Sequence, residues 1–295
     1  MPYQYPPSEL ILNPDGSIYH LNLLPQDIGE YIITVGDPGR VEKVSRYFDF
    51  IEVRKSKREF VTHTGWLSDK RITVISTGIG PDNIDIVLNE LDALVNIDLQ
   101  NRSDKKTFKS LKVIRLGTSG CLQSDIPVDS VVSSVFGLSF DNMLRFYEWS
   151  PSDTEQQLQQ DWHTFEAETQ LSIPVVPLAV SGSWELLENL AEDHHRGITI
   201  TAPGFYAPQT RYLRARGIIK ADAFDSMENF SSQGVKLTNL EMETAAIYGL
   251  SRLLGHQALS CSAILANRAN NTFSKRPKKI VEQMIRQVLG RIADL

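Results

Sequence analysis

The sequence predicts an α/β fold, a three-layer α/β/α sandwich around a mixed central sheet. Short apolar runs of β-type composition alternate along the chain with longer segments whose apolar residues recur at helical spacing. The chain has 295 residues, of which 41% are hydrophobic and 22% charged, as in ordinary globular enzymes. It shows no internal repeat and no boundary that would favour two domains. We therefore expect residues 1–295 to form a single domain.

The predicted sheet begins after residue 28. Short β-type runs, bounded by polar or glycine-bearing turns, predict its strands. The expected strands are Tyr31–Val35, Glu59–Trp66, Arg71–Ser76, Val113–Leu116, Ser130–Val135, Val175–Val180 and Ile198–Thr201, with a further apolar run at Ala258–Ala266.

Helices are expected between these strands. Apolar residues at helical spacing, or long polar stretches without breakers, predict helices at Asn83–Leu99, Asp153–Gln170, Met242–Leu254 and Lys279–Leu295. Residues 1–18, which include the proline- and tyrosine-rich start of the chain, predict an irregular N-terminal arm that lies against the body or a partner. Residues 100–111 are polar and basic, and predict an inserted loop or hairpin rather than a nucleic-acid patch.

Bulk charge and composition exclude some functions. The formal net charge of −6 argues against a protein that binds nucleic acid independently of sequence. The start of the chain lacks the pattern of a signal peptide and no apolar run is long enough to span a membrane, so we expect a cytoplasmic protein without membrane partners. The two cysteines, Cys121 and Cys261, favour buried thiols over a disulfide. No histidine or cysteine spacing predicts a metal site.

Two glycine- and arginine-bearing segments follow apolar runs directly. They are Gly36–Arg40 and Arg115–Gly120, which we interpret as turns. Glycine lets backbone N–H groups approach an oxyanion, while arginine supplies charge. The two segments together predict a phosphate held from two sides.

Four segments occur in a specific order: Gly36–Arg40, Lys57–Phe60, Gly78–Gly80 and Arg115–Gly120. With them the chain resembles the nucleoside phosphorylase-I (PNP/UDP) superfamily and, within it, the uridine phosphorylases, from about Tyr19 to the C-terminal helix. The resemblance implies a phosphorylase/hydrolase-like sandwich and a pentosyltransferase activity. Uridine and phosphate would be the substrates, and uracil and ribose 1-phosphate the products.

The resemblance implies a phosphate site made of Gly36, Arg40, Arg58, Arg115 and Thr118. In such enzymes the residue matching Arg58 reaches the phosphate of the neighbouring subunit, and the one matching Thr118 touches both phosphate and ribose. Three guanidinium groups around one small anion make physical sense, because their forked donors orient phosphate while neutralising it.

The same resemblance implies a ribose site made of His20, Thr118, Met242 and Glu243. His20 would contact the 5′-hydroxyl in the adjacent protomer. Glu243 would accept hydrogen bonds from the 2′- and 3′-hydroxyls and stabilise a sugar that becomes oxocarbenium-like. Arg115, Thr118 and Glu243 would be catalytic. Sites shared across an interface imply at least a homodimer, and possibly a trimer of dimers.

The segment Phe205–Arg211 resembles the base-recognition segment of uridine phosphorylases. Gln209 offers a donor and an acceptor and Arg211 offers donors only, which matches the edge of uracil. Phe205 would pack on the base or ribose, and Arg268 would add to the uracil site. Purine-cleaving relatives carry an aspartate near Asn267 that protonates the departing base. An amide cannot do so, which favours a pyrimidine.

Alternatives remain open from the sequence. They are a purine nucleoside phosphorylase, a nucleosidase that uses water, and a nucleoside-binding protein without catalysis. The resemblance implies no cofactor beyond phosphate as co-substrate. Some bacterial relatives bind a monovalent cation at the dimer interface through a glutamate matching Glu59 and a nearby hydroxyl. Asn83 stands where that hydroxyl is frequent, which disfavours the cation here.

Overall fold

The computed structural model describes residues 3–220 and 222–295. Within them the helices are α1 (Pro38–Ser45), α2 (Pro81–Asn96), α3 (Asp153–Thr169), α4 (Trp184–Leu190), α5 (Ala223–Met227), α6 (Thr244–Leu253) and α7 (Pro277–Ala293). The strands are β1 (Tyr31–Val35), β2 (Phe50–Lys57), β3 (Phe60–Leu67), β4 (Lys70–Ser76), β5 (Ile97–Asp98), β6 (Ser103–Asp104), β7 (Lys112–Cys121), β8 (Val131–Ser139), β9 (Leu178–Ser181), β10 (His195–Thr201), β11 (Ser231–Ser232), β12 (Val235–Glu241), β13 (Gln257–Asn267) and β14 (Thr272–Phe273). No helix in these two ranges has the length and apolar character needed to cross a bilayer.

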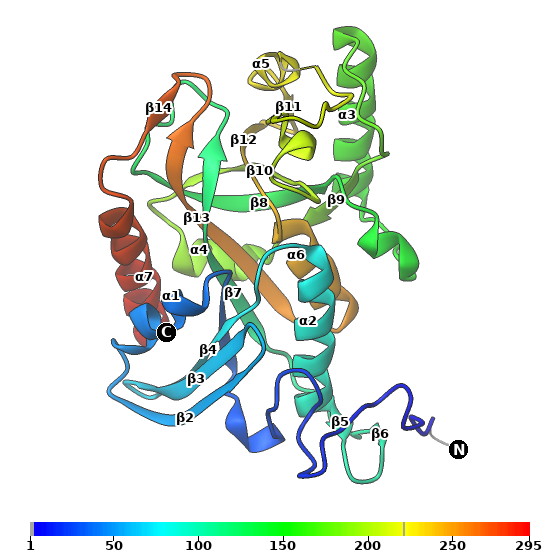
Figure 1. Cartoon of the computed structure of the whole chain (residues 1–295), viewed down its shortest axis with the longest axis vertical. Coiled ribbons are helices and arrows are strands. Elements are labelled where there is room, and N and C mark those ends of the chain that lie inside the picture. Colours follow the sequence, from blue (N-terminus) through cyan, green and yellow to red (C-terminus); the bar gives the residue numbers. More distant parts are fainter. Residues whose placement is uncertain (1–2, 221) are drawn as a thin grey trace.

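One large mixed sheet organises the chain (Figure 1). Its main path is β11-β12-β10-β8-β13-β7-β1-β4-β3-β2, with β9 beside β8 and β14 beside β13. Because β12 also pairs with β7, the strands β12, β10, β8, β13 and β7 form a closed ring. Parallel pairs such as β1 with β4 coexist with antiparallel pairs such as β2 with β3. The predicted α/β class with a mixed central sheet is confirmed.

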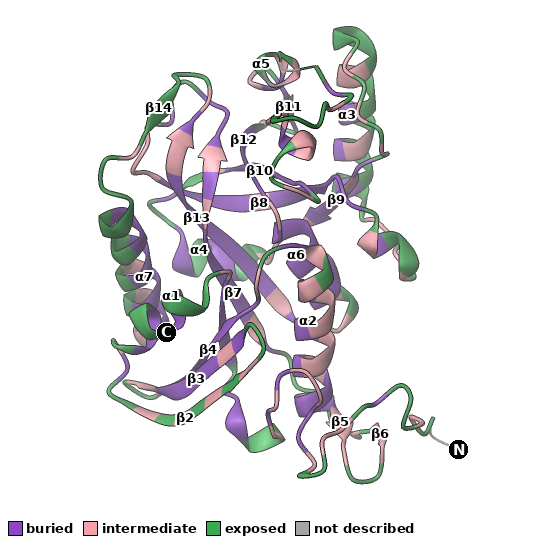
Figure 2. Ribbon diagram, in the orientation of Figure 1, coloured by how far each residue is buried: buried purple, intermediate pink, exposed green. Residues whose placement is uncertain are grey.

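Helices cover both faces of the sheet. Side chains alternate in direction along β1, so that Ile33 joins a core with α1, α4 and α7, while Ile32 joins a second core with α2 and α6. A third cluster surrounds Trp162 of α3. Figure 2 shows the central strands as mainly buried between these helices. This helix–sheet–helix layering is the predicted arrangement.

Three segments meet where the parallel strands β1 and β4 end. Val35, the last residue of β1, pairs with Ser76, the last residue of β4, and Thr34 pairs with Arg115 in β7. The segment after β1, the Gly78–Gly80 segment after β4 and the second half of β7 therefore lie at one edge of the sheet. Ligands of open α/β sheets bind at this kind of edge.

Some local predictions were wrong. Arg115–Gly120 is not a turn but part of β7, which continues through Cys121 because β13 and β12 pair with it there. In the segment Gly36–Arg40 only Gly36 and Asp37 precede the helix, since α1 begins at Pro38. The strands β2 and β12 were not predicted. β2 is a sheet-edge strand with no buried residue and a charged composition, so its sequence lacks the apolar run of a central strand.

The N-terminal arm lies on the inserted segment. The guanidinium of Arg102 donates hydrogen bonds to the backbone oxygens of Tyr5, Pro6 and Leu10. The insertion itself forms the β5–β6 hairpin, in which Ile97 pairs with Asp104. The hairpin begins at Ile97, before the predicted bounds of residues 100–111. Residues 3–18 contact the chain's own body through Arg102. Residues 1 and 2 lie outside the described residues.

Candidate active site

Nine predicted site residues line one cavity of about 740 Å³ at this edge of the sheet. They come from four parts of the fold: the start of α1, β7, the β12–α6 junction and the loop after β10. The nine are Gly36, Arg40, Arg115, Thr118, Phe205, Gln209, Arg211, Met242 and Glu243. The chain thus gathers predicted phosphate, ribose and base residues around a single space.

The segment after β1 forms one wall of the cavity. Asp37 caps α1 by accepting a hydrogen bond from the backbone N–H of Gly39 at 2.9 Å. A Cβ at Gly36 would lie only 3.3 Å from a carbonyl oxygen of the glycine turn after β4, so the two turns approach closely. Arg40 donates to the backbone oxygen of Leu116 at 3.2 Å. At the start of α1, Pro38 has no N–H, and the N–H groups of Gly39 and Arg40 are bonded to Asp37. The guanidinium of Arg40 is therefore the group of this wall that attracts an anion.

Arg115 lies buried within β7, with its guanidinium between two carboxylates. Its Nη2 is 2.7 Å from Glu243 Oε2 and 3.0 Å from Glu241 Oε2, and its Nη1 donates to Ser262 Oγ at 3.1 Å. A Cβ at Gly117 would fall 1.9 Å from Nη1, so the guanidinium folds over a position that only glycine can occupy. Burial disfavours the charged form, but Glu241 and Glu243 outweigh it and hold the pKa of Arg115 above its ordinary value.

Glu243 immediately precedes α6 and is also buried. Its Oε1 accepts a hydrogen bond from the backbone N–H of Gly80 at 2.9 Å, and its Oε2 accepts one from Arg115. Burial raises the pKa of Glu243 above its ordinary value; the charge of Arg115 opposes this shift, while that of Glu241 adds to it. In its ionised form, the Glu243 carboxylate accepts hydrogen bonds from two sides of the cavity, from Gly80 and from Arg115.

The base end of the cavity is a pair of polar side chains beside an aromatic ring. Arg211 donates from Nη1 to Oε1 of Gln209 and to the backbone oxygen of Phe205, the latter at 3.1 Å. Its guanidinium lies 4.1 Å from the centroid of the Phe205 ring. Because Oε1 of the buried Gln209 faces Arg211, the amide has one defined orientation, which leaves its NH₂ on the other side.

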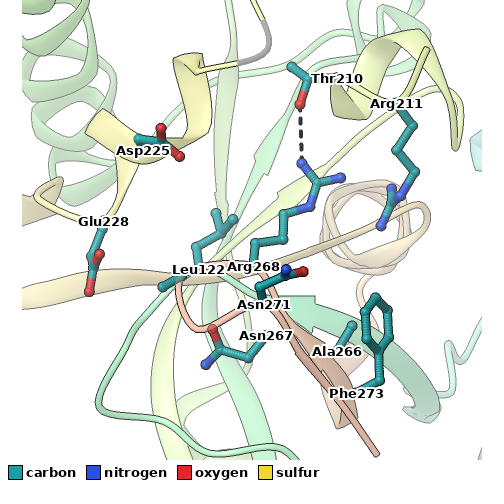
Figure 3. A pocket seen from close by; sticks show the side chains of 11 residues that line it. Leu122, Thr210, Arg211, Asp225, Glu228, Ala266, Asn267, Arg268, Asn271 and Phe273 are labelled. Carbon is teal, nitrogen blue, oxygen red and sulfur yellow. Dashed lines mark hydrogen bonds between the residues drawn. The ribbon is translucent and has the colours of Figure 1, made fainter.

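Arg268 lies outside this cavity and lines a neighbouring one of about 600 Å³ (Figure 3). It donates to the backbone oxygen of Gln209 at 2.6 Å and to Thr210 Oγ1 at 3.2 Å. Burial, and then the charge of Arg211, lowers the pKa of Arg268 to about 10. Arg211 and Phe273 line both cavities. The structure thus places Arg268 behind the base-recognition loop, which it supports.

Asn267 is an anchor rather than a reactive group. Its amide nitrogen donates to the backbone oxygens of Gln123 at 2.8 Å and Ile126 at 2.7 Å, and its Oδ1 accepts the N–H of Asn270 at 3.0 Å. This side chain is buried and its polar atoms are engaged. It offers no proton to a departing base.

His20 and Arg58 lie outside the cavity of their own chain, but close to each other. His20 Nδ1 is 2.6 Å from Glu90 Oε1, and the His20 ring packs edge-on against Tyr19 with centroids 4.8 Å apart. Arg58 is exposed at the β2–β3 turn, with its guanidinium 6.0 Å from the centroid of the Tyr19 ring. The two predicted cross-subunit residues therefore share one surface region of the fold.

Three site contacts were not predicted from the sequence. They come from Glu241, Ser262 and the backbone N–H of Gly80. Glu241 did carry a signal, because it lies two residues before Glu243, which was already assigned to the site. Ser262 and Gly80 are brought in by strand pairing and by a turn, which leave no mark on a single sequence.

Cysteine and metal predictions concern residues away from the cavity. Cys121 and Cys261 are buried free thiols, as predicted, and burial raises the pKa of each to about 11. In the part of the chain that the structure describes, no three His, Cys, Asp or Glu side chains gather in a way that could hold a metal ion.

Comparisons with known proteins point to one family. The model of the phosphorylase superfamily matches residues 30–295. A uridine phosphorylase of Treponema pallidum is 30% identical over 79% of this chain and 75% of its own length, and one of Thermococcus kodakarensis is 28% identical over 90% and 83%. A Trypanosoma brucei nucleoside phosphorylase, whose crystal structure is described as showing uridine phosphorylase activity, is 25% identical. It superposes with a TM-score of 0.87 over 97% of this chain and 100% of its own.

Proposed function

The chain belongs to the phosphorylase superfamily, and on that premise we propose that it is a uridine phosphorylase. The enzyme cleaves uridine with inorganic phosphate to give uracil and ribose 1-phosphate. The observation that carries the proposal is one cavity that joins the Arg115–Glu243 pair to the Gln209–Arg211 pair. Curated relatives named as uridine phosphorylases support it.

Phosphate binds between α1 and β7 in this proposal. Arg40 and Arg115 supply charge, and the backbone at Gly36 and the hydroxyl of Thr118 supply further donors. Inside the cavity, however, Arg115 is paired with two carboxylates, Glu241 and Glu243, and Asp37 lines the same space beside Arg40.

An anionic substrate is therefore better held with one more cation. We assign that role to Arg58 of a second subunit. His20 of the same second subunit would reach the ribose 5′-hydroxyl. Support comes from their position, because both lie outside their own cavity and near the same tyrosine, Tyr19. This argues for at least a homodimer with shared sites, and a trimer of dimers is compatible with it.

The reaction proceeds by displacement at C1′ of the ribose. Glu243 accepts hydrogen bonds from the 2′- and 3′-hydroxyls and Met242 lies against the sugar. As the C1′–N1 bond breaks, its electron pair leaves with uracil, and the ring becomes oxocarbenium-like beside the ionised carboxylate. A phosphate oxygen then bonds to C1′ with inversion. Orientation and electrostatics supply the catalysis, without a covalent enzyme intermediate.

Uracil leaves as an anion that the base end of the cavity stabilises. The NH₂ of Gln209 donates to O2, its Oε1 accepts from N3–H, and Arg211 donates to O4. Phe205 packs against the base or ribose. Arg268 acts through Gln209, whose backbone oxygen it holds. Because Asn267 is not an acid and is engaged elsewhere, a purine that needs protonation is poorly served.

Phosphate is the only co-substrate that we propose, and we propose no cofactor. A cytoplasmic location stays a prediction, as does the absence of the monovalent cation that some relatives bind near the position of Glu59.

Initial rates of base release test the base assignment directly. Uridine, 2′-deoxyuridine, thymidine and inosine are compared at one phosphate concentration. We expect the highest kcat/KM among the ribonucleosides for uridine, with inosine lower by at least about 10²-fold, the size of a lost or mismatched set of buried hydrogen bonds. Equal turnover of inosine would replace the proposal with a purine nucleoside phosphorylase.

A further inference from the structure

Glu241 ends β12 and lines the cavity, two residues before Glu243. We propose that Glu241 is a positioning residue that holds the phosphate-binding Arg115 and the ribose-binding Glu243 in register. The inference rests on the proposed function, since it concerns how the two halves of that site stay aligned.

The side chain of Glu241 is bonded to both of those halves and to the end of β10. Its Oε2 accepts from Arg115 Nη2 at 3.0 Å and from the backbone N–H of Glu243 at 2.8 Å. Both oxygens accept from the N–H of Thr244 at 3.0 Å, and Oε1 accepts from Thr201 Oγ1 at 2.8 Å. One buried carboxylate thus ties an arginine of β7 to the first residues of α6.

A second carboxylate matters because Glu243 has two tasks. Arg115 is held by Glu241 and Glu243 together. When ribose hydroxyls donate to Glu243, they compete with Arg115 for the same oxygens. Glu241, which lies behind both residues, then remains as the carboxylate that keeps Arg115 aimed at phosphate.

The substitution Glu241→Gln separates this role from simple space filling. Glutamine has nearly the same shape, but one of its two terminal atoms is an NH₂ that cannot accept a hydrogen bond. The donors around the side chain are Arg115, Glu243 N–H, Thr244 N–H and Thr201 Oγ1. At least one of them must therefore lose its acceptor, and the charge that faces Arg115 disappears.

The experiment measures kcat and both KM values of the Glu241→Gln enzyme. We expect KM for phosphate and KM for uridine to rise together, each by about tenfold or more, the size of a lost hydrogen bond to a charged group. Arg40→Ala is the comparison within the site, where we expect the phosphate KM to rise far more than the uridine KM. The wild-type enzyme, run beside them, tests the proposed function itself.

Glu155→Gln is the matched control for burial. Glu155 of α3 is buried, accepts the N–H groups of Ser152 and Ser181 and pairs with Arg252, but it does not line the cavity. We expect this variant to lower Tm while both KM values stay within about twofold of wild type. Thr201→Val gives a milder second disturbance of Glu241 if Glu241→Gln does not fold, and the same paired rise is expected.

The outcomes are distinct. An active wild type combined with unchanged KM values in Glu241→Gln, or with a rise in one KM alone, overturns the positioning role. If Glu241→Gln does not fold, the same two results in Thr201→Val overturn it. An inactive wild type instead contradicts the proposed function.

Discussion

The two ends of the cavity are built in different ways. The phosphate–ribose end consists of buried charged groups on strands and at a strand–helix junction, with Arg115 7% and Glu243 5% exposed. The base end is carried by a loop after β10 and by β14, where Phe205 is 51% and Phe273 71% exposed. Only Gln209 at that end is as buried as the charged pair.

This difference assigns catalysis to the phosphate–ribose end of the cavity and the choice of nucleoside to the base end. Charge that develops at C1′ is best stabilised by groups that are already oriented, and paired strands provide that rigidity. Residues that recognise a ligand often lie on loops that a rigid scaffold positions, as the loop after β10 does here. We therefore expect substitutions at the first end to lower turnover of every nucleoside, and substitutions at the second end to change which nucleoside is used.

The largest effect is expected from Arg115→Ala. The change removes a phosphate donor and leaves Glu241 and Glu243 buried without their counter-charge. Activity should fall by about 10³-fold, and the free energy of unfolding should fall by about 3–5 kcal/mol. Steady-state kinetics and urea unfolding measure the two losses. Near-normal activity, or normal stability, would contradict the role given to Arg115 at the phosphate–ribose end.

Glu243→Gln should lower kcat by about 10²-fold or more, because the variant lacks the charge that stabilises the sugar cation. The pH profile sharpens the test. Burial raises the pKa of Glu243, and activity requires the ionised form, so wild-type activity should fall as pH drops through a pKa above the ordinary glutamate value. The variant should lack this acid limb.

The same raised pKa has a consequence for folding. The native state binds this proton more tightly than the unfolded chain does, so the group stabilises the fold below its unfolded pKa. That contribution is lost as pH rises through the raised native pKa. Urea unfolding of wild type and Glu243→Gln between pH 4 and 8 checks the sign, and an identical pH dependence in both would argue against it.

Mixing two low-activity variants tests whether one chain alone forms a complete phosphate–ribose end. Arg58→Ala and Arg115→Ala are each expected to have low activity. In a mixed dimer, one site combines an intact Arg115 with the partner's intact Arg58. Random reassembly of equal amounts should therefore recover about a quarter of wild-type activity, because half of the dimers are mixed and each holds one intact site. No recovery after exchange would mean that each chain forms its site alone.

The smallest expected effect is that of Gln209→Ala. Uridine loses its contacts at O2 and N3, so its KM should rise by about tenfold, while KM for phosphate should stay close to the wild-type value. Steady-state kinetics in each substrate measure both. If phosphate KM rose instead, the two ends of the cavity would not be separate in function.

The sequence predicted the order of the central elements and nine of the residues that line the cavity. Tyr31–Val35 is a strand with the predicted bounds, because an apolar run fully buried in a sheet leaves a clear pattern. The sequence failed where partners decide the structure. Arg115–Gly120 contains two glycines and a serine, residues typical of a turn, yet pairing with β13 keeps it extended.

The same limit applies to the site. Composition and resemblance pointed to Arg115 and Glu243 but not to the bond between them, because 128 residues separate the two in sequence. Arg268 was predicted to add to the uracil site; its side chain donates to the backbone oxygen of Gln209, and a contact with uracil stays a prediction. Which face a side chain presents at a strand end is fixed by three-dimensional pairing, and a single sequence does not record it.

The fate of phosphate tests the central claim most directly. Uridine is incubated with the wild-type enzyme and inorganic phosphate, and the reaction is followed by ³¹P NMR. We predict that ribose 1-phosphate appears in an amount equal to the uracil released, and that no uracil is released in phosphate-free buffer. Uracil release at the same rate without phosphate, with free ribose as the product, would contradict the account.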